Sequence, residues 1–564
     1  MQRITKQTGD KIKPDSNAKS REQPTWWLKG GYPLLWIAIG AFLLYGQSIG
    51  FSYSYLDDHN LILNQLDKIQ HLNYIPQAFR EDVFHMPAGK GFYYRPILTV
   101  SFVLDAVIGS GSLWIFHFSN IIYHLLAVYL LFLCLTALKF DPLKSFLFSL
   151  VFLFHPVVTQ AVAWIPGRND ILLTVFILTS FLFFIRYLDN AKWQNFLFHS
   201  VFWFLALLTK ETALILPVLL FPAGLLLFRA PLRKLIFPGL VWIFLVILWF
   251  SIRASVLGNE SNYQVKDSVV SLMANLPAIL PFLGKSLLPF SLSVFPILTD
   301  MKASSVLGIV SVIILVIMVF FTRPRTWGFF LFTMAWYILF LVPTFIKHTQ
   351  TEDLTEHRLY LPLIGIILVF MISGPVRKIN PGKSISKTLV GMVIILFAII
   401  SVIHLQAFRD RYTFWQNAVN TSPSHAYNYN TLGAMYFLDG ELVQAERYFR
   451  KAVEINPSEP QVNANIGLIC MRKGDIGEAE KFYRKEIRIN PQYDNVYYNY
   501  GILYFKKGNI DSAIVSWEKT IEISPAYINA YRALMMVYDT LHLKADYFRI
   551  KDLAEKNGLI KTIP

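Results

Sequence analysis

The feature that most constrains the fold of this chain is a succession of apolar runs, each close to the length that crosses a bilayer. Of the 564 residues, 54% are hydrophobic and only 16% are charged, which favours a membrane protein over a soluble one of this length. The expected spans are 33–51, 113–138, 144–162, 168–188, 195–209, 211–228, 235–257, 303–322, 326–346, 358–374 and 387–406. The sequence therefore predicts an all-α protein in which residues 31–406 form a polytopic helix bundle with about eleven crossings.

The formal net charge of +15 is best explained by membrane topology. Lys and Arg collect in the loops that a cytoplasmic N-terminus would place inside, and no compact basic face interleaved with aromatics indicates nucleic-acid binding. Residues 1–30 are then expected to form a disordered cytoplasmic tail, with the C-terminal domain outside. The cysteines, Cys134 and Cys470, lie in different domains, so the sequence implies neither a disulfide framework nor a thiolate metal site.

The run 270–290 is the exception to this regular pattern. It contains Pro277, Pro281 and Pro289, which would break a straight helix. We therefore expect an interfacial or re-entrant segment on the outer face, and not a further crossing.

A repeat begins where the apolar runs end. Prolines, glycines and alanines recur there at intervals of 34 residues. They are Pro423, Pro457, Pro491 and Pro525; Gly433, Gly467 and Gly501; Gly440, Gly474 and Gly508; and Ala445, Ala479 and Ala513. This period is that of the tetratricopeptide repeat, a pair of antiparallel helices. After a linker at 407–423, we predict a soluble α-solenoid over 424–564, with three clear repeats and a degenerate fourth (526–559) as the terminal cap.

Asp57 and Asp58 follow directly on the first apolar run, so two adjacent carboxylates lie where a membrane helix meets water. A carboxylate at that depth is costly unless it is paired or used. One could act as a general base on an attacking hydroxyl, while the other orients the acceptor, holds a divalent cation (Mg²⁺ or Mn²⁺) or raises its neighbour's pKa. The alternative is an interfacial acidic pair without a role. Because Asn60 and Asn64 lie on the same turn, we expect the outer loop 52–112 to be catalytic.

The other outer loops also carry charge. Lys210 and Glu211 lie between two spans with almost no loop, where they form either a structural ion pair or a contact to phosphate and sugar. Arg168 and Asp170 flank a polar turn that a salt bridge alone could explain.

The last outer loop leads into His357, Arg358 and Tyr360. Arg suits a phosphate ligand, although Arg and Tyr are also common anchors at the ends of spans. Charged clusters in separate outer loops suggest one shared cavity. No His or Cys spacing typical of a metal site is present.

These segments together resemble the GT-C class of integral-membrane glycosyltransferases. Within that class they are most similar to the transmembrane O-mannosyltransferase-like family that carries tetratricopeptide repeats. The likeness rests, in chain order, on residues 57–64, 94–97, 155–170, 210–211 and 356–362. The family usually has Glu where this chain has Gln160 and Ala where it has Asn169.

The resemblance implies an inverting transfer of a sugar from a polyprenyl-phosphate-linked donor to a hydroxyl acceptor, with protein Ser or Thr favoured. It implies Asp57 or Asp58 as the base. It also implies donor phosphate and sugar contacts from Arg95, Arg168, Asp170, Lys210, Glu211, His357, Arg358 and Tyr360. The reaction would face the periplasm from a bacterial inner membrane, or the lumen of the endoplasmic reticulum in a eukaryote.

The repeats would then bind the acceptor polypeptide or glycan, or a protein partner. Asn465 and Asn499 occupy the same phase of successive repeats and could bond a peptide backbone, although Asn is ordinary at that position. Two alternatives come from other classes. One is a lipid-linked polysaccharide ligase or polymerase, which the short outer loop at 347–357 disfavours. The other is a non-enzymatic membrane scaffold that recruits partners through the repeats.

Overall fold

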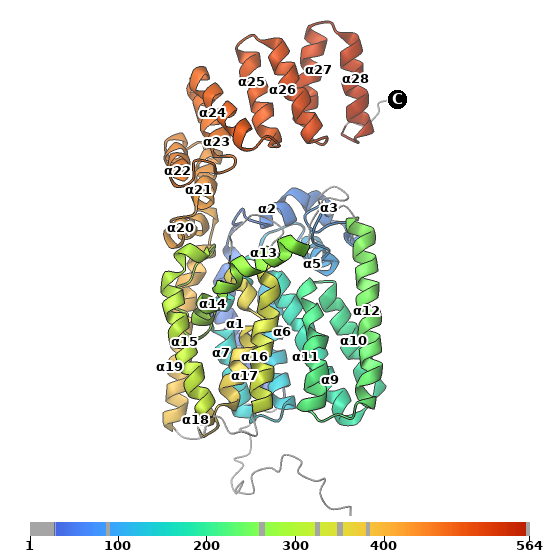
Figure 1. Cartoon of the computed structure of the whole chain (residues 1–564), viewed down its shortest axis with the longest axis vertical. Helices are drawn as coiled ribbons and strands as arrows, with labels where there is room; N and C mark the ends of the chain where they lie inside the picture. Colours follow the sequence, from blue (N-terminus) through green and yellow to red (C-terminus); the bar gives the residue numbers. More distant parts are fainter. Residues whose placement is uncertain are drawn as a thin grey trace, which may run out of the picture. The chain divides into compact units, whose positions relative to one another are not determined.

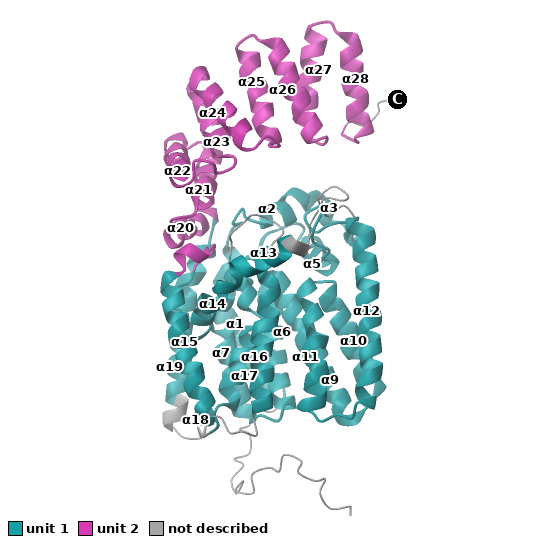
Figure 2. Ribbon diagram, viewed as in Figure 1, with its two compact units in different colours: residues 1–292, 302–410 teal, residues 293–301, 411–564 magenta. Residues whose placement is uncertain are grey.

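The computed structural model describes residues 28, 30–85, 91–258, 265–321, 327–346, 354–378 and 384–559. Every regular element in these residues is a helix, so the all-α class with a membrane bundle followed by repeats is confirmed (Figure 1). The chain divides into two compact units, which Figure 2 colours separately. The predicted N-terminal tail, residues 1–30, lies almost wholly outside the described residues.

Unit 1 contains residues 1–292 and 302–410. Its longer helices are α1 (Tyr32–Tyr45), α5 (Pro96–Ile108), α6 (Trp114–Ala137), α7 (Pro142–Leu153), α9 (Arg168–Asn190), α10 (Trp193–Leu207), α11 (Ile215–Leu226), α12 (Arg233–Leu257), α13 (Val265–Asn275), α14 (Ile279–Leu287), α15 (Lys302–Phe320), α16 (Trp327–Leu341), α17 (Leu363–Ile372) and α19 (Ser384–Leu405). Its short helices include α2 (Asp58–Leu61), α3 (Leu66–Ile69), α4 (Ile75–Ala78), α8 (Thr159–Ala163), α18 (Gly374–Lys378) and the 3-10 turns η6 (Ile165–Gly167), η7 (Glu211–Leu214) and η12 (Glu356–Leu359).

Among the described residues, eight helices are long and apolar enough to cross a membrane, or nine if the bent pair α7–α8 counts as one span. That pair, Pro142–Leu153 and Pro156–Ala163, bends by 52° where residues 144–162 were expected to form a single span. The expected spans 195–209, 211–228 and 358–374 overlap the shorter helices α10, α11 and α17. The figure of about eleven crossings therefore stays a prediction.

The proline-containing run behaves differently from the other apolar runs. Asp267–Leu287 has the length and composition of a span, although we expected an interfacial segment. Figure 1 shows α13, its first part, lying across one end of the bundle. The turn η8 (Leu276–Ala278), which contains Pro277, separates α13 from α14.

Hydrogen bonds identify the two ends of unit 1. At one end, Lys144 of α7 donates to the carbonyl oxygens of Val376 and Arg377 of α18, so these two helices meet there. At the other end, the Ser52 amide donates to the Arg409 carbonyl oxygen at 2.8 Å. The first outer loop and the last residues of unit 1 therefore lie at the same end of the bundle.

Helix α9 is an interior helix of the bundle. It packs against both α6 and α10, and 72% of its apolar window is buried, compared with 22% for α12, α15 and α19. The peripheral helices instead expose large apolar side chains, as a lipid-facing surface requires. The polar start of α9 is therefore held inside the protein, where it contributes to the candidate site.

Unit 2 contains residues 293–301 and 411–564. Its helices are α20 (Arg411–Thr421), α21 (Ala426–Leu438), α22 (Leu442–Ile455), α23 (Val462–Lys473), α24 (Ile476–Ile489), α25 (Asp494–Lys506), α26 (Ile510–Ile523), α27 (Ile528–Thr540) and α28 (Lys544–Lys556). The last eight form four antiparallel hairpins, as the 34-residue period predicts. The degenerate fourth repeat is also a complete hairpin.

Glycine is required inside each of the first three hairpins. A Cβ on Gly433, Gly467 or Gly501 would lie 2.4–2.8 Å from an aromatic ring on the second helix of the same repeat. The turn glycines Gly440 and Gly474 have φ of +81° and +84°, which side chains disfavour. The recurring glycines therefore serve close helix packing and tight turns.

The expected linker at 407–423 is mostly helical. Residues 411–421 form α20, which buries Phe414 and Trp415 and packs against α21. Residues 293–301, which interrupt unit 1 in the sequence, also join unit 2: the Phe295 ring lies 5.8 Å from that of Trp415. The amide of Ser424 donates to Asp300 at 3.0 Å. No repeat marker occurs in either segment, which is why the sequence did not reveal this part of unit 2.

Candidate functional site

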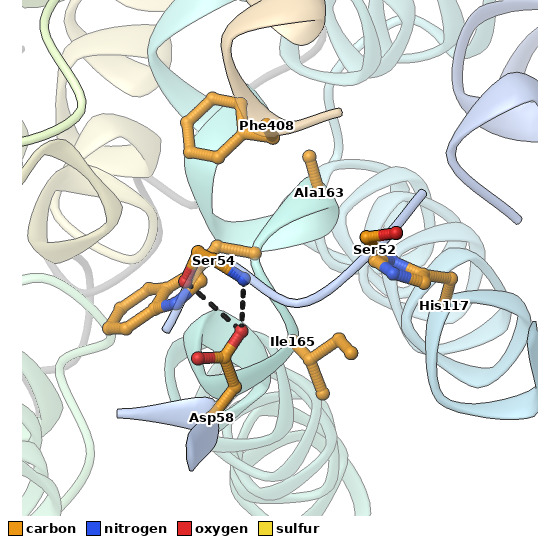
Figure 3. Close-up of a pocket in the computed structure, with 8 residues that line it drawn as sticks. Ser52, Ser54, Asp58, His117, Ala163, Ile165 and Phe408 are labelled. Carbon is orange, nitrogen blue, oxygen red and sulfur yellow. Dashed lines mark hydrogen bonds between the residues drawn. The ribbon is translucent and has the colours of Figure 1, made fainter. Parts of the chain in front are cut away.

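A small cavity in unit 1 brings the first outer loop against the α8–η6 turn. It is narrow, and its empty space of about 180 Å³ includes open solvent. Its lining residues are Ser52, Ser54, Asp58, His117, Ala163, Trp164, Ile165 and Phe408 (Figure 3). Asp58 is the only carboxylate among these lining residues, so the cavity singles out one of the two adjacent acids.

The local backbone holds Asp58 in place. Tyr55 has a φ of +61°, and the loop turns so that Ser54 faces the start of α2. The Ser54 amide and hydroxyl donate to one oxygen of Asp58 at 2.6 and 3.0 Å (Figure 3). The His59 amide donates to the other oxygen at 3.1 Å. Asp58 is 1% exposed, whereas Asp57, the N-cap residue of α2, is partly exposed. The two acids therefore have different environments.

Burial raises the pKa of the Asp58 carboxyl above its ordinary value of 3.8, although the hydrogen bonds from Ser54 and His59 oppose this rise. A buried carboxylate with a raised pKa is a better proton acceptor than an exposed one. This environment suits a general base.

A charged cluster lies where the starts of α5, α9, η7 and η12 meet. Lys210 donates to both oxygens of Asp170 at 2.8 Å, and His357 Nε2 lies 3.8 Å from the same carboxylate. Arg95 binds Glu211 through two nitrogens, at 2.6 and 3.2 Å. Five of the predicted site residues, drawn from four separate segments of the sequence, therefore form adjoining ion pairs.

The ion pairs of this cluster differ in exposure. The Lys210, Asp170 and His357 side chains are less than a tenth exposed, and the Glu211 side chain is 38% exposed. The Arg95 guanidinium also lies 4.5 Å from the Tyr93 ring centroid. The arrangement is a mostly buried group of cations and carboxylates whose most exposed member is Glu211.

Trp164 connects the Asp58 cavity to the charged cluster. It lines the cavity, and its ring centroid lies 5.1 Å from that of His357. The carboxamide of Asn120 holds the turn on which it lies, by donating to the carbonyl oxygens of Val162, Trp164 and Ile165 at 3.2–3.4 Å. Gly167 permits that turn, since a Cβ there would lie 2.8 Å from the Ala161 Cα.

Arg168 has a different environment from the other predicted phosphate ligands. It is fully buried, and all three of its nitrogens donate to protein acceptors: Nε to Asn120, Nη1 to Ser101, and Nη2 to the Phe116 carbonyl and the Ser119 hydroxyl. Its Nη2 also lies 2.6 Å from the Asp105 carboxylate. This geometry favours a structural role for Arg168 over a contact with donor phosphate.

Tyr360 and Arg358 also have protein partners. The Tyr360 hydroxyl lies 2.5 Å from His124 Nδ1, and its ring packs on Phe152, so it stabilises the bundle interior. Arg358 is partly exposed and donates to the Thr344 carbonyl oxygen at 3.2 Å. Of the two, only Arg358 is placed to reach a ligand.

A second buried ion pair supports the loop that carries His357. Lys285 of α14 donates to Glu356 at 2.5 Å, and His404 of α19 lies 3.4 Å from the same carboxylate. The Gln160 carboxamide accepts from the His357 amide at 3.0 Å. Sequence reasoning named no site role for Lys285, Glu356, His404 or Trp164. For Lys285 and His404 the available signal was an ionisable residue within an apolar run, whereas Trp164 and Glu356 lie in segments that carry the family resemblance.

The predicted acceptor contacts on the repeats were Asn465 and Asn499. Asn465 donates to the Asn430 side chain at 2.8 Å, so it links the first helices of two successive repeats. Asn499 is partly buried on α25. Their role in binding an acceptor stays a prediction.

Among the residues that the structure describes, no group of three or more His, Cys, Asp or Glu side chains is placed to hold a metal ion. Both oxygens of Asp58 already accept hydrogen bonds from the protein. The divalent cation suggested beside Asp57 stays a prediction, and no step below depends on it.

The chain is similar to known proteins by its repeats and by pairwise alignment. The family model described as tetratricopeptide repeat matches residues 426–459, 460–493 and 494–527. "Protein O-mannosyl-transferase Tmtc1" of Drosophila melanogaster is 29% identical over 177 residues, which is 31% of this chain and 20% of that protein. "Protein O-mannosyl-transferase TMTC2" of Mus musculus is 35% identical over 101 residues, 18% of this chain and 12% of that protein. The family resemblance inferred from the motifs is thus confirmed.

These alignments span a fifth or less of the length of those two relatives. Among solved structures, "Crystal structure of MamA" matches 26% of this chain and 88% of that chain at 23% identity, with a TM-score of 0.24.

Proposed function

We propose that this protein is a membrane glycosyltransferase that moves a sugar from a polyprenyl-phosphate-linked donor to a hydroxyl acceptor, with protein Ser or Thr as the favoured acceptor. The observation that carries the proposal is Asp58, a buried carboxylate in a cavity whose Trp164 wall also contacts the charged cluster. The names of the relatives support the class of reaction, and mannose is accordingly the first sugar to test.

In the proposed reaction, Asp58 removes the proton of the acceptor hydroxyl as its oxygen attacks the anomeric carbon. The bond between that carbon and the phosphate oxygen breaks, and polyprenyl phosphate leaves with the bonding electrons. The configuration at the anomeric carbon inverts. Because a phosphate is a weak base, its departure needs no second acid, and the proton remains on Asp58 until solvent removes it.

The charged cluster would bind the leaving phosphate. Lys210 and Arg95 are cations held by carboxylates, and His357 lies between Trp164 and Asp170. In a mostly buried site, a cation stabilises developing negative charge more strongly than in water. Arg358, which is partly exposed, would complete the phosphate contacts from the last outer loop.

The repeats would bind the acceptor or a protein partner. The last residue of unit 1 in the sequence is Asp410. Its neighbour Arg409 accepts a hydrogen bond from Ser52, so the chain leaves unit 1 at the end that carries the first outer loop. The chain would then enter the repeats in the compartment onto which the Asp58 cavity opens, the periplasm or the lumen.

The direct test uses purified protein in detergent or vesicles, a polyprenyl-phosphate-mannose donor and Ser/Thr-containing acceptor peptides, with products identified by mass spectrometry. Asp58→Asn should reduce kcat by about 10²–10⁴-fold while the protein stays folded. Asp67→Asn, an exposed acid in the same loop, is the matched control and should keep full activity. Full activity of Asp58→Asn would remove the proposed base.

The same experiment separates the alternatives. A polysaccharide ligase or polymerase would transfer sugar to a glycan acceptor and leave the peptides unmodified. A scaffold would release no polyprenyl phosphate from the donor with any acceptor.

A further inference from the structure

Trp164 has an unused hydrogen-bond donor at a functional position. Its indole is 4% exposed, and its Nε1 has no hydrogen-bond partner among the described residues. Buried polar groups are rarely left unpaired, and Trp N–H groups usually find an acceptor when they are buried. The unpaired donor therefore needs an explanation.

Other buried tryptophans of unit 1 have acceptors for their indole N–H groups. The indoles of Trp203, Trp242 and Trp336 donate to Ala213, His199 and Leu361, respectively. Trp249 on α12 is unpaired like Trp164, but it does not line the Asp58 cavity. Trp164 alone of these five combines an unpaired N–H with a place in the cavity wall.

The order of the reacting groups in the proposed sugar transfer indicates which part of the donor lies next to Trp164. In an in-line transfer, the acceptor oxygen, the anomeric carbon and the leaving phosphate oxygen lie in that order. The base lies at the acceptor end and the phosphate-binding groups at the other. Trp164 lines the cavity with Asp58 and packs on His357 of the charged cluster, so it adjoins both ends of this line. The group between the two ends is the sugar.

We propose that Trp164 binds the transferred sugar, with its indole N–H donating to a sugar oxygen and its ring forming one wall of the sugar subsite. This inference rests on the proposed function and specifies the sugar subsite within it. The Asn120 amide group donates to carbonyl oxygens of this turn, which orients the backbone that carries the ring.

The test compares donor binding with and without the sugar. Trp164→Phe keeps an aromatic ring but removes the N–H. The KM for polyprenyl-phosphate-mannose should rise about three- to tenfold, the loss expected for one neutral hydrogen bond. The inhibition constant of polyprenyl phosphate, which lacks the sugar, should stay within about twofold. That second constant also reports that the phosphate site is still folded.

Trp249→Phe is the matched control, because it removes another buried, unpaired indole N–H from the same unit. It should change neither constant. The inference is overturned if Trp164→Phe leaves both constants unchanged, or if it weakens binding of polyprenyl phosphate as much as binding of the donor. Failure of the proposed function has a different signature, because the wild-type protein would then transfer no sugar.

Discussion

At the scale of residues, Asp57 and Asp58 are neighbours whose roles are separated by burial. Asp58 accepts three hydrogen bonds from Ser54 and His59 and lines the cavity, whereas Asp57 is partly exposed. The sequence marks the pair as unusual but treats both acids alike. Only the three-dimensional fold brings one of them against Trp164.

The raised pKa of Asp58 predicts the pH dependence of transfer. Only the ionised carboxylate can accept a proton, so kcat/KM should fall on the acid side with an apparent pKa above 3.8. The raised pKa also makes the stability of the fold depend on pH, and stability changes with pH in the opposite direction to activity. Because ionisation is harder in the folded state, this group lowers the free energy of unfolding as pH rises from about 3.8 through the raised pKa.

Ser54→Ala tests this assignment with a small change. It removes the hydroxyl donor to Asp58 but keeps the amide donor of the same residue. Loss of a bond to the ionised form should move the acid limb of kcat/KM upward by about 0.5–1 pH unit, measured in a pH–rate profile. If the acid limb of the kcat/KM profile does not move, the group that titrates there is not Asp58.

Arg168 is the predicted site residue whose environment least resembles a ligand-binding position. Arg168→Met would leave Asp105 buried without its cation, which should lower the free energy of unfolding by about 3–5 kcal/mol. A second substitution, Asp105→Leu, should restore much of that loss because it removes the unpaired charge. The measurement is thermal unfolding in detergent. Normal unfolding of Arg168→Met combined with a raised donor KM would support the phosphate contact.

At the scale of elements, periodicity predicted the repeats well. Prolines, glycines and alanines at intervals of 34 correctly placed the hairpins from α21 to α26, since each residue has a local packing reason. The same markers are absent from α20 and from residues 293–301, so their membership of unit 2 was not predicted. Trp164 was given no role from the sequence, because an aromatic residue beside a polar turn is common at a membrane interface.

Gly467 tests the packing argument. A Cβ at this position would lie 2.5 Å from the Tyr483 ring, so Gly467→Ala should destabilise its hairpin by about 1–3 kcal/mol. Faster hydrogen exchange in α23 and α24 of the full chain would report this effect. Gly477→Ala is the matched control, because the nearest atom is 3.9 Å away, and it should slow exchange through its better helix propensity. Equal behaviour of the two variants would contradict the close-packing explanation.

At the scale of the whole molecule, the distribution of charge predicts a sidedness and hydropathy predicts a number of crossings, and both stay predictions. Lys144 lies at the end of unit 1 opposite the contact between Ser52 and Arg409, and the predicted topology makes that end cytoplasmic. Spans were harder to count because breaks interrupt them, such as the 52° bend between α7 and α8. A bent segment packed inside a protein can still satisfy its backbone, so composition alone does not define a crossing.

Labelling of engineered cysteines in intact vesicles tests the proposed sidedness. His71→Cys in the first outer loop and Ser458→Cys in the repeats, both exposed, should react with a membrane-impermeant maleimide from the same side. Lys139→Cys, at the α6–α7 connection, should react only from the other side or after permeabilisation. The natural cysteines, Cys134 and Cys470, are buried and provide a low background. If Ser458→Cys reacts from the side of Lys139→Cys, the repeats lie across the bilayer from Asp58. They could not then deliver an acceptor to it, and the role proposed for the repeats would fail even if transfer itself persisted.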